Sequence, residues 1–363
     1  MRGSIHTKNQ KISYMHPSDI TSPCSVNSAN QVRYITASAE DAGQRLDNFL
    51  MRQLKGVPKS HLYRLIRKGE VRINSKRTKP LYKLVAGDHI RIPPVRTARQ
   101  EQKKISTAQQ LGWLAAYVCF EDKDILVCNK PAGLAVHGGS GVDLGFIEYM
   151  RIWQNNQRLE LVHRIDRYTT GCLLLVKRRS LLQPLQAIWH SNQVEKTYLA
   201  LVAGQWPKTM KNVHMSLSSI QRHGEKYIRP DAQGQYAETL FHLQHYVPHA
   251  PQIAAMQATM QTVPHWRGDF SLVEAKLVTG RTHQIRVHCQ YAGYPLIGDT
   301  KYGDPAINQV LVRSGYKSMF LHAASLTFVH PVTQKIMTIS ARIHPAEQQL
   351  LQMLGIKKQA LAP

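Results

Sequence analysis

From about Trp113 onward, the chain is a succession of short apolar segments separated by turn residues. The clearest of these segments are ILVCNK at 125–130, CLLLVK at 172–177, YLALVAGQW at 198–206 and FSLVEAKLV at 270–278. Apolar runs of this length, bounded by turn residues, are typical of β-strands. The helical segments do not alternate regularly with the strands, which disfavours a parallel βαβ arrangement. The sequence therefore predicts an α+β domain with a mixed, mostly antiparallel sheet over residues 113–350.

A smaller unit precedes this domain. Within residues 44–55, apolar side chains recur at the i, i+3, i+4 and i+8 spacing of one helix face. A second amphipathic helix follows Pro58 and ends at Gly69, which can take the left-handed conformation that closes a helix. Short strands are expected at 31–36, 71–73 and 88–93. We predict five parts: a disordered tail (1–31), a small α/β domain (32–95), a polar linker (96–112), the α+β domain (113–350) and a C-terminal tail (351–363).

Basic residues concentrate in the small domain. Between Arg52 and Arg91 there are 12 Lys and Arg residues but only 2 Asp and Glu residues, so this stretch supplies +10 of the formal charge of +24. This concentration favours a phosphate-binding face over a diffuse, solvated basic surface. The residues of this domain that we expect to form this phosphate-binding face are Arg45, Lys59, Arg64, Arg67, Lys68, Arg72 and Lys76.

Several other classes of protein are disfavoured. The five cysteines are scattered without a CxxC pair, which argues against a disulfide framework or a structural zinc site and fits a reducing cytoplasm. The longest apolar runs are far too short to cross a bilayer. His283 and His288 lie five residues apart and miss the i, i+4 spacing of a zinc-binding helix. The glycine-rich HGGSG at 137–141 lacks a GK[ST] or Rossmann spacing, so we expect neither a metal nor a nucleotide cofactor.

The segment LVHRIDRYTTGCLLLVKR at 161–178 carries the strongest candidate for chemistry. An apolar strand delivers Asp166 to a loop between Arg164 and Arg167, and a second apolar strand leaves after a turn at 169–171. The flanking positive charges favour the ionised carboxylate, which is the form that nucleophilic catalysis needs. The alternative from the residues alone is a hairpin whose aspartate only accepts hydrogen bonds from turn amides.

A second cluster, LVTGRTHQIRVHCQYAG at 277–293, predicts a short helix capped by Thr282. Its apolar positions fall on one face, so Arg286 and His283 project elsewhere. Such an arginine can pair with a carboxylate, clamp a phosphate, or simply be a surface residue. Tyr198, which opens an apolar strand, can stack on a base or be a half-buried strand residue.

Residues 161–178 resemble the signature of the RluA family of pseudouridine synthases, in which HRLD is followed by two variable residues, TSG and an apolar strand ending in Ala-Lys. This chain has HRID-RY-TTG-CLLLVK, with conservative replacements at Ile165, Thr170 and Val176. Other blocks resemble further family segments in the same order: ILVCNKPAGLAVHGG at 125–139, KTYLALV at 196–202, GRTHQIRVHCQYAGYPLIGDTKYG at 280–303 and FLHAASLTFVHP at 320–331. Residues 43–93 resemble the S4 RNA-binding domain.

Within the family, the chain looks most like the RluC branch. This likeness rests on QLKGVPKS at 53–60, KGEVRIN at 68–74 and AVHGGSG at 135–141. That branch is associated with uridines of large-subunit ribosomal RNA near the peptidyl-transferase centre. Residues 246–268 look longer than the family's connection, so we expect an inserted surface loop there.

The resemblance implies the pseudouridine synthase fold and the isomerisation of uridine to pseudouridine, a redox-neutral reaction that requires no cofactor. Asp166 would attack C1′ of the sugar or C6 of the base, or take the C2′ proton, and Arg286 would pair with it. Tyr198 would stack on the uracil and help to remove the C5 proton. Arg164 would hold the flipped nucleotide or fill its place. The other residues of this domain expected to contact RNA are Arg167, Thr169 and His283.

We therefore expect a monomeric cytoplasmic enzyme that acts on large-subunit ribosomal RNA. The alternatives are a non-catalytic RNA-binding or ribosome-assembly protein of the same fold, a synthase of the family that acts on another RNA, and a metal-dependent nuclease. The presence of Asp166, Tyr198 and Arg286 together argues against the first alternative. The lack of a carboxylate cluster in the sequence argues against the nuclease.

Overall fold

The computed structural model describes residues 31–54, 57–95, 109–138, 144–191, 193–222, 224–248 and 266–356. By its internal contacts the chain divides into two compact units, residues 1–103 and 104–363, and each is described by itself. Four expected segments fall wholly or partly outside the described residues: 1–30 of the N-terminal tail, 96–108 of the linker, 249–265 of the inserted loop and 357–363 of the C-terminal tail.

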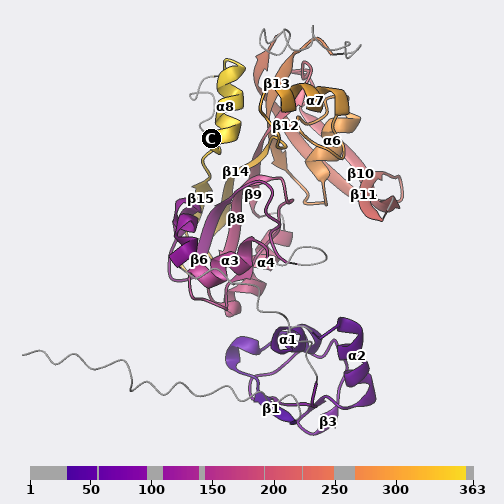
Figure 1. Ribbon diagram of the computed structural model, residues 1–363, viewed down its shortest axis with the longest axis vertical. Coiled ribbons are helices and arrows are strands. Elements are labelled where there is room, and N and C mark those ends of the chain that lie inside the picture. Colours follow the sequence, from indigo (N-terminus) through magenta and orange to yellow (C-terminus); the bar gives the residue numbers. More distant parts are fainter. Residues whose placement is uncertain are drawn as a thin grey trace, which may run out of the picture. The chain divides into compact units, whose positions relative to one another are not determined.

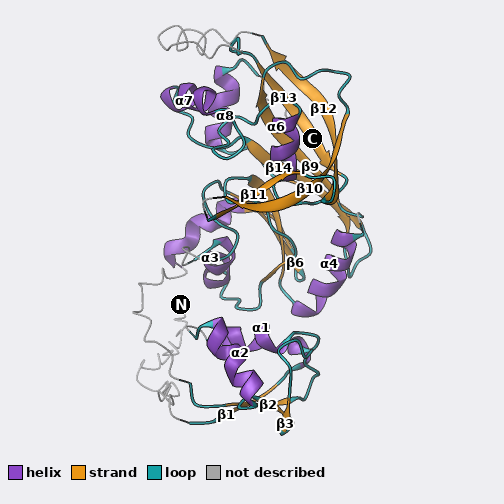
Figure 2. Ribbon diagram, turned by 90° about the vertical axis from the view of Figure 1, so that its right-hand side faces the viewer, coloured by secondary structure: helices purple, strands orange, loops and turns teal. Residues whose placement is uncertain are grey.

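The N-terminal unit packs two helices on a small antiparallel sheet (Figures 1 and 2). The strand order is β1-β4-β2-β3. The elements are β1 (Arg33–Thr36), the 3-10 helix η1 (Ala39–Asp41), α1 (Leu46–Gln53), α2 (Lys59–Lys68), β2 (Arg72–Ile73), β3 (Lys76–Arg77) and β4 (His89–Ile92). The apolar stripe expected within residues 44–55 is buried in the core of this unit. Gly69 ends α2 at a φ of 74°, as predicted.

The C-terminal unit is built on one sheet with 11 strands among the described residues. The order is β11-β10-β12-β13-β9-β14-β8-β6-β5, with β15 beside β14 and β7 beside β8. The strands are β5 (Val118–Glu121), β6 (Ile125–Lys130), β7 (Glu160–Leu161), β8 (Thr170–Val176), β9 (Glu195–Ala203), β10 (Asn212–Arg222), β11 (Glu225–Pro230), β12 (Gln235–Val247), β13 (Phe270–Leu277), β14 (Leu321–Val329) and β15 (Ile336–Ser340). Among the described strands, only β8 and β14 pair in parallel. The mixed, mostly antiparallel sheet of the α+β prediction is confirmed.

Helices cover both faces of this sheet (Figure 2). They are η2 (Gln109–Tyr117), α3 (Phe146–Trp153), η3 (Arg179–Leu181), α4 (Leu182–His190), α6 (Gln284–Tyr291), α7 (Pro305–Arg313) and α8 (Pro345–Met353). Strand β9 contributes to two cores, one on each face of the sheet. The first core contains Tyr198, Ala200 and Val202 together with residues of α4 and α6. The second contains Leu199, Leu201 and Ala203 together with residues of α7 and α8. Because both faces are buried, such strands read as continuous apolar runs.

The parallel pairing of β8 and β14 sets the position of the loop before β8. Gly171 pairs with Ala323 and has a φ of 101°. A Cβ atom on Gly171 would lie 2.2 Å from the carbonyl oxygen of Ala323, so only glycine allows this close approach of the two strands. The predicted turn at 169–171 is therefore wrong in extent, because Thr170 and Gly171 already belong to β8. None of the described helices has the length and apolar character needed to cross a membrane.

Candidate active site

Asp166 lies in the loop between β7 and β8, and the loop turns directly after it. The amide of Thr169 donates to the carbonyl oxygen of Asp166 at 3.2 Å. The side chain of Asp166 is engaged differently: its Oδ2 accepts a hydrogen bond from Nη1 of Arg286 at 2.9 Å. No turn amide donates to the Asp166 carboxylate within the described part of the chain, so the arrangement is not that of a simple turn aspartate.

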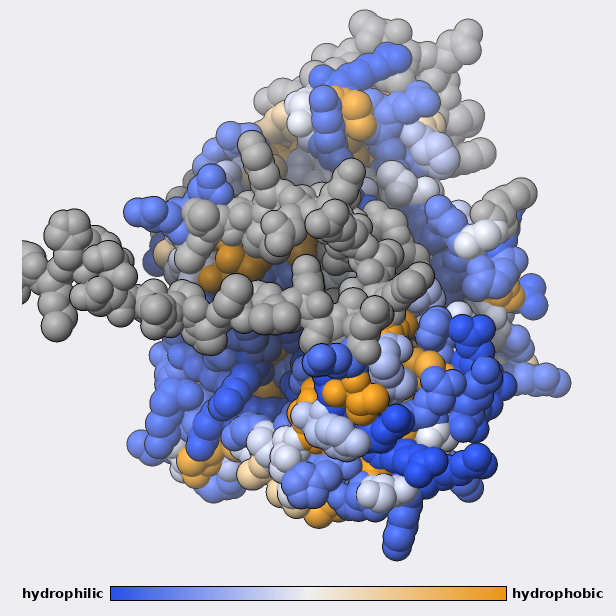
Figure 3. All heavy atoms as spheres, turned by 60° about the horizontal axis from the view of Figure 1, so that its bottom comes forward, coloured by the Kyte–Doolittle hydropathy of each residue, from blue (hydrophilic) through white to orange (hydrophobic). Residues whose placement is uncertain are grey.

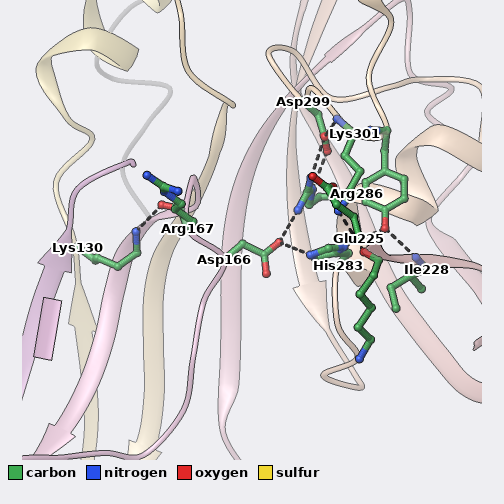
Figure 4. A network of polar contacts seen from close by, with 11 residues as sticks. Lys130, Asp166, Arg167, Glu225, Ile228, His283, Arg286, Asp299 and Lys301 are labelled. Carbon is green, nitrogen blue, oxygen red and sulfur yellow. Dashed lines mark hydrogen bonds and ion pairs between the residues drawn. The ribbon is translucent and has the colours of Figure 1, made fainter. Parts of the chain in front are cut away.

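The two arginines beside Asp166 in the sequence contact neighbouring loops. Nη1 of Arg164 lies 3.0 Å from Nε2 of His137, and Nε of Arg167 donates to the carbonyl oxygen of Gly133 at 2.7 Å. The cation that pairs with Asp166 therefore comes from 120 residues further along the chain. Figure 4 shows the Asp166 carboxylate pointing toward Arg286 and His283.

Arg286 is held from its other side by a second carboxylate. Its Nε and Nη2 donate to Oδ2 and Oδ1 of Asp299 at 2.7 and 2.8 Å (Figure 4). The side chain of Asp299 is fully buried, and its Oδ1 also accepts from the amides of Lys301 and Tyr302. Burial raises the pKa of Asp299, but its hydrogen bond and ion pair with Arg286 outweigh this and leave that pKa below its ordinary value. The guanidinium is thus fixed in orientation before any substrate arrives.

His283 occupies the N-cap of α6 in the left-handed conformation, at a φ of 54°. The predicted cap, Thr282, is wrong by one residue. The reason is tertiary, since Nδ1 of His283 lies 2.8 Å from the hydroxyl of Tyr302, which itself accepts from the amide of Ile228. Nε2 of His283 lies 3.7 Å from Oδ2 of Asp166, and burial lowers the pKa of His283.

Tyr198 projects from β9 into the same place and is only 8% exposed. Burial raises its pKa, and the charge of Asp166 adds to the effect. The phenol therefore stays protonated at neutral pH. Its hydroxyl makes no hydrogen bond among the described residues, which leaves it available to a bound molecule.

Lys130, at the end of β6, forms a hydrogen bond with the loop that carries Asp166. Its fully buried ammonium donates to the carbonyl oxygens of Pro131, Leu134 and Arg167, at 2.7, 3.0 and 3.0 Å. Burial lowers its pKa to about 7. Through the carbonyl of Arg167, Lys130 ties the loop that carries Asp166 to the loop that follows β6.

Several of these side chains line one cleft of about 670 Å³. Seven of the predicted site residues meet there: Arg164, Asp166, Arg167, Thr169, Tyr198, His283 and Arg286. Asp166 is the only acidic residue among the described residues that line the cleft, which also holds Lys196 and Arg281. The cleft is thus suited to an anionic ligand that presents a reactive group to one carboxylate.

The other seven predicted residues lie in the N-terminal unit. Some of them are engaged by other groups of this unit, and others are exposed without an acidic partner. Arg45 is engaged by Asp47, with Nη2 to Oδ2 at 2.6 Å. Arg64, Arg67, Lys68 and Lys76 are exposed and have no acidic partner in the described part of the chain. Lys59 lies over the ring of Tyr63, and Nε of Arg72 donates to the carbonyl oxygen of Gly69. Hydrophilic residues dominate the lower part of the view in Figure 3, where this unit is brought forward.

Sequence reasoning assigned no role to Asp299, Tyr302 or Lys130, although each lies in a segment that it singled out. The signal for the first two was the polar GDTKYG turn at 298–303, and that for Lys130 was a lysine ending an apolar strand. One group of described residues could hold a metal ion: Asp122, Asp124 and His330. Asp122 accepts from backbone amides and from His330, and Asp124 pairs with Arg178, so the group already serves the fold.

Two family models match the chain. The model of the RNA pseudouridylate synthases matches residues 124–291, and that of the S4 domain matches residues 44–90. The first match contains Asp166, Tyr198 and Arg286, and the second contains α1, α2, β2 and β3.

Similar proteins match over nearly the whole chain. Ribosomal large subunit pseudouridine synthase C of Salmonella typhimurium is 46% identical over 328 residues, which cover 89% of this chain and 97% of that protein. The protein of the same name from Escherichia coli is 45% identical with the same coverage. The solved structure of human RNA pseudouridylate synthase domain containing 4 aligns with a TM-score of 0.50 at 22% identity, over 68% of this chain and 96% of that chain. That structural likeness shows a shared fold.

Proposed function

The chain belongs to the RNA pseudouridine synthase family and carries an S4 domain, and on this basis we propose that it isomerises uridines of large-subunit ribosomal RNA to pseudouridine with Asp166 as its catalytic carboxylate. The choice of RNA follows the names of the relatives that it resembles over 89% of its length. The observation that carries the choice of residue is the 2.9 Å hydrogen bond from Arg286 to Asp166 in the cleft.

In the reaction, the bond between ribose C1′ and uracil N1 breaks and a bond between C1′ and C5 forms. The proton on C5 leaves and N1 gains one, so atoms and electrons balance without a redox cofactor. Attack at C1′, attack at C6 and removal of the C2′ proton all begin with an ionised carboxylate. The ion pair of Asp166 with Arg286 holds that carboxylate in a fixed orientation, and so serves each of these routes.

Tyr198 and Arg164 complete the proposal. A flipped uracil can stack on the Tyr198 ring, and the unpartnered hydroxyl can take part in the removal of the C5 proton. Arg164, which contacts His137 at the edge of the cleft, is placed to hold the flipped nucleotide or fill its former position. Arg167, Thr169 and His283 line the remaining wall.

The S4 domain supplies RNA affinity in this proposal. We assign it to residues 32–95, joined through 96–112 to a catalytic domain over 113–350. Exposed arginines and lysines without acidic partners, such as Arg64, Arg67 and Lys68, bind phosphates and release counterions. With large-subunit ribosomal RNA as its substrate, we propose that the protein works in the cytoplasm as a monomer without a cofactor.

The test is carbodiimide-based primer extension on bare large-subunit ribosomal RNA after incubation with the purified protein. We expect new stops at a few uridines with wild type and none with Asp166→Asn, both in the presence of EDTA. Small-subunit ribosomal RNA and transfer RNA serve as parallel substrates. Stops on one of these alone would show a synthase with another target, and stops made by both proteins would exclude Asp166 as the catalytic carboxylate.

A further inference from the structure

Lys196 places a buried ammonium group on the wall of the cleft. It lies on β9 two residues before Tyr198, so the two side chains point to the same face of the sheet, and both line the cleft. Only 3% of Lys196 is exposed. Two residues along a strand span about 7 Å, so the two side chains are direct neighbours along the wall.

The Lys196 ammonium differs from the other buried cations of the site because no acceptor among the described residues contacts it. Lys130 donates to three carbonyl oxygens, and Arg286 donates to two carboxylates. In the described part of the chain, no carboxylate and no hydrogen-bond acceptor contacts the ammonium of Lys196. Burial lowers its pKa, and no nearby acid restores it. A buried cation without a counter-charge is costly, and the bound state of the cleft is where that cost can be offset.

The groups around Lys196 cannot supply the missing acceptor. Nζ lies 5.6 Å from the centroid of the Trp189 ring, in cation–π geometry. The other aromatic contact of Trp189 is His163, which stacks on it with a centroid separation of 3.9 Å. Nε2 of His163 is already occupied, because it accepts from the amide of Leu174 at 3.0 Å. The aromatic pair thus fixes the position of Lys196 while leaving its charge uncompensated.

We propose that Lys196 binds a backbone phosphate of the RNA strand at or next to the nucleotide that stacks on Tyr198. This inference rests on the proposed function, because it takes the ligand of the cleft to be RNA. A phosphate brings the negative charge that the wall lacks, and a lysine recognises it as a point charge without demanding one base. The subsite would hold the strand in register while Asp166 acts on the sugar or the base.

The test compares Lys196→Met with wild type in RNA binding at several salt concentrations. Methionine keeps the unbranched shape and removes the charge, and Lys196→Gln is a second variant with a polar end. Lys276→Met is the matched control, because Lys276 pairs with Thr197 of β9, lies on the opposite face of the sheet and is bound to Glu195 at 2.5 Å. The probe is a uridine-containing stem–loop from large-subunit ribosomal RNA. Isomerisation of its uridine to pseudouridine does not change the charge of this RNA.

We expect Lys196→Met to bind about tenfold more weakly at low salt. The slope of log affinity against log salt should fall by about 0.7, as for one single-stranded phosphate. The melting temperature of Lys196→Met should not fall, since the lost charge has no partner. The control variant Lys276→Met should keep the wild-type salt slope. An unchanged slope in Lys196→Met and Lys196→Gln overturns the inference, as does a lower melting temperature with unchanged binding. Pseudouridine formation by wild type on the same RNA is scored separately, so failure of the proposed function is distinguished from failure of the subsite.

A substrate-side measurement tests the same contact without altering the protein. Single neutral methylphosphonate linkages are placed in turn around the target uridine. One position should weaken binding to wild type about tenfold and leave binding to Lys196→Met unchanged. If every position affects the two proteins equally, Lys196 contacts no phosphate.

Discussion

Asp299 holds the guanidinium of Arg286 with two hydrogen bonds, of 2.7 and 2.8 Å, and leaves Nη1 of the same group directed at Asp166. Asp299 does not line the cleft. Under the proposed function, it would act through Arg286 and so be a positioning residue. A guanidinium held at two of its nitrogens loses little freedom when it pairs with a third group, so the Asp166 carboxylate is oriented in advance.

The first prediction concerns Asp299→Asn. Asparagine keeps one acceptor oxygen but loses the charge, so Arg286 should sample other orientations. We expect kcat to fall about 100-fold with KM nearly unchanged, and the free energy of unfolding to fall by about 3 kcal/mol because a buried ion pair is broken. Single-turnover kinetics at a temperature where the variant is folded separates the two effects.

Asp304→Asn is the matched control for this change. Asp304 caps α7 by accepting from the amides of Ala306 and Ile307, and asparagine is an equally good N-cap. Its kcat and stability should stay at the wild-type values. A stability loss in Asp299→Asn with an unchanged kcat would show that the orientation of Arg286 does not limit the reaction.

The second prediction is that Asp166→Asn abolishes turnover and leaves RNA affinity near normal. The amide is isosteric and can still accept from Arg286, so the cleft should keep its shape. Loss of a nucleophile or of its charge costs about 10⁴-fold or more. Filter binding at fixed salt and primer extension on the same preparation provide the two measurements. Appreciable residual activity would remove Asp166 from its proposed role.

The local features of the fold were predictable because they depend on neighbouring residues. The apolar stripe of α1, the left-handed Gly69 and the apolar strands β6, β8, β9 and β13 follow from spacing and composition. The parallel pairing of β8 with β14 was not predictable. It joins residues more than 150 positions apart, such as Thr170 and His322, and no local pattern specifies it.

The same distinction applies to the candidate site. The resemblance marked Asp166, Tyr198 and Arg286, yet neither the resemblance nor the spacing indicated that Asp299 would hold the arginine. The start of α6 was misjudged because the left-handed His283 is stabilised by Tyr302, a contact that only the folded chain makes. Sequence therefore marked residues that the fold brings into one cleft, and tertiary contacts decide how they are oriented.

The third prediction is that Tyr198→Phe lowers kcat about 100-fold, the usual contribution of a positioned proton-transfer group. Phenylalanine keeps the ring that would stack on uracil, so KM should change little. The Tyr198 hydroxyl makes no hydrogen bond in the described structure, so melting temperature should not fall. A variant with wild-type kcat would limit Tyr198 to stacking, and Tyr198→Leu then tests that role through KM.

The fourth prediction concerns the exposed basic face of α2. Replacing Arg64, Arg67 and Lys68 together by glutamine should reduce the salt slope of RNA binding by about 2 to 3, since each phosphate contact contributes 0.7 to 0.9. All three side chains are exposed, so stability should change little. The measurement is fluorescence anisotropy with a labelled ribosomal RNA fragment between low and moderate salt.

A triple variant of Arg313, Lys317 and Lys335 removes the same charge from exposed positions of the other unit. It controls for the general loss of positive field, and its slope should stay close to wild type. Equal slopes for the two triple variants would show that α2 does not contact phosphate more than the rest of the surface does.

The last prediction is an acid sensitivity that originates at His163. Burial lowers the pKa of this histidine from 6.5 to about 3, so the folded protein keeps it neutral while its Nε2 accepts from the Leu174 amide. The unfolded chain takes up a proton near pH 6.5. It therefore binds more protons than the folded chain between about pH 6.5 and 3, and stability falls as the pH is lowered through that window. Above pH 6.5 His163 contributes no pH dependence.

Between pH 7 and pH 5, this one group should remove about 2 kcal/mol from the free energy of unfolding. His163→Gln can still accept from the Leu174 amide but does not titrate, so the loss between the two pH values should be smaller by that amount. Urea unfolding followed by tryptophan fluorescence reports the C-terminal unit alone, because all 5 tryptophans lie between residues 113 and 266. His322, whose pKa burial lowers to about 4, remains in both proteins and accounts for part of the residual slope. If His163→Gln lost as much stability as wild type, the folded protein would have to bind a proton at His163 well above pH 3, and its stacking on Trp189 would involve the imidazolium.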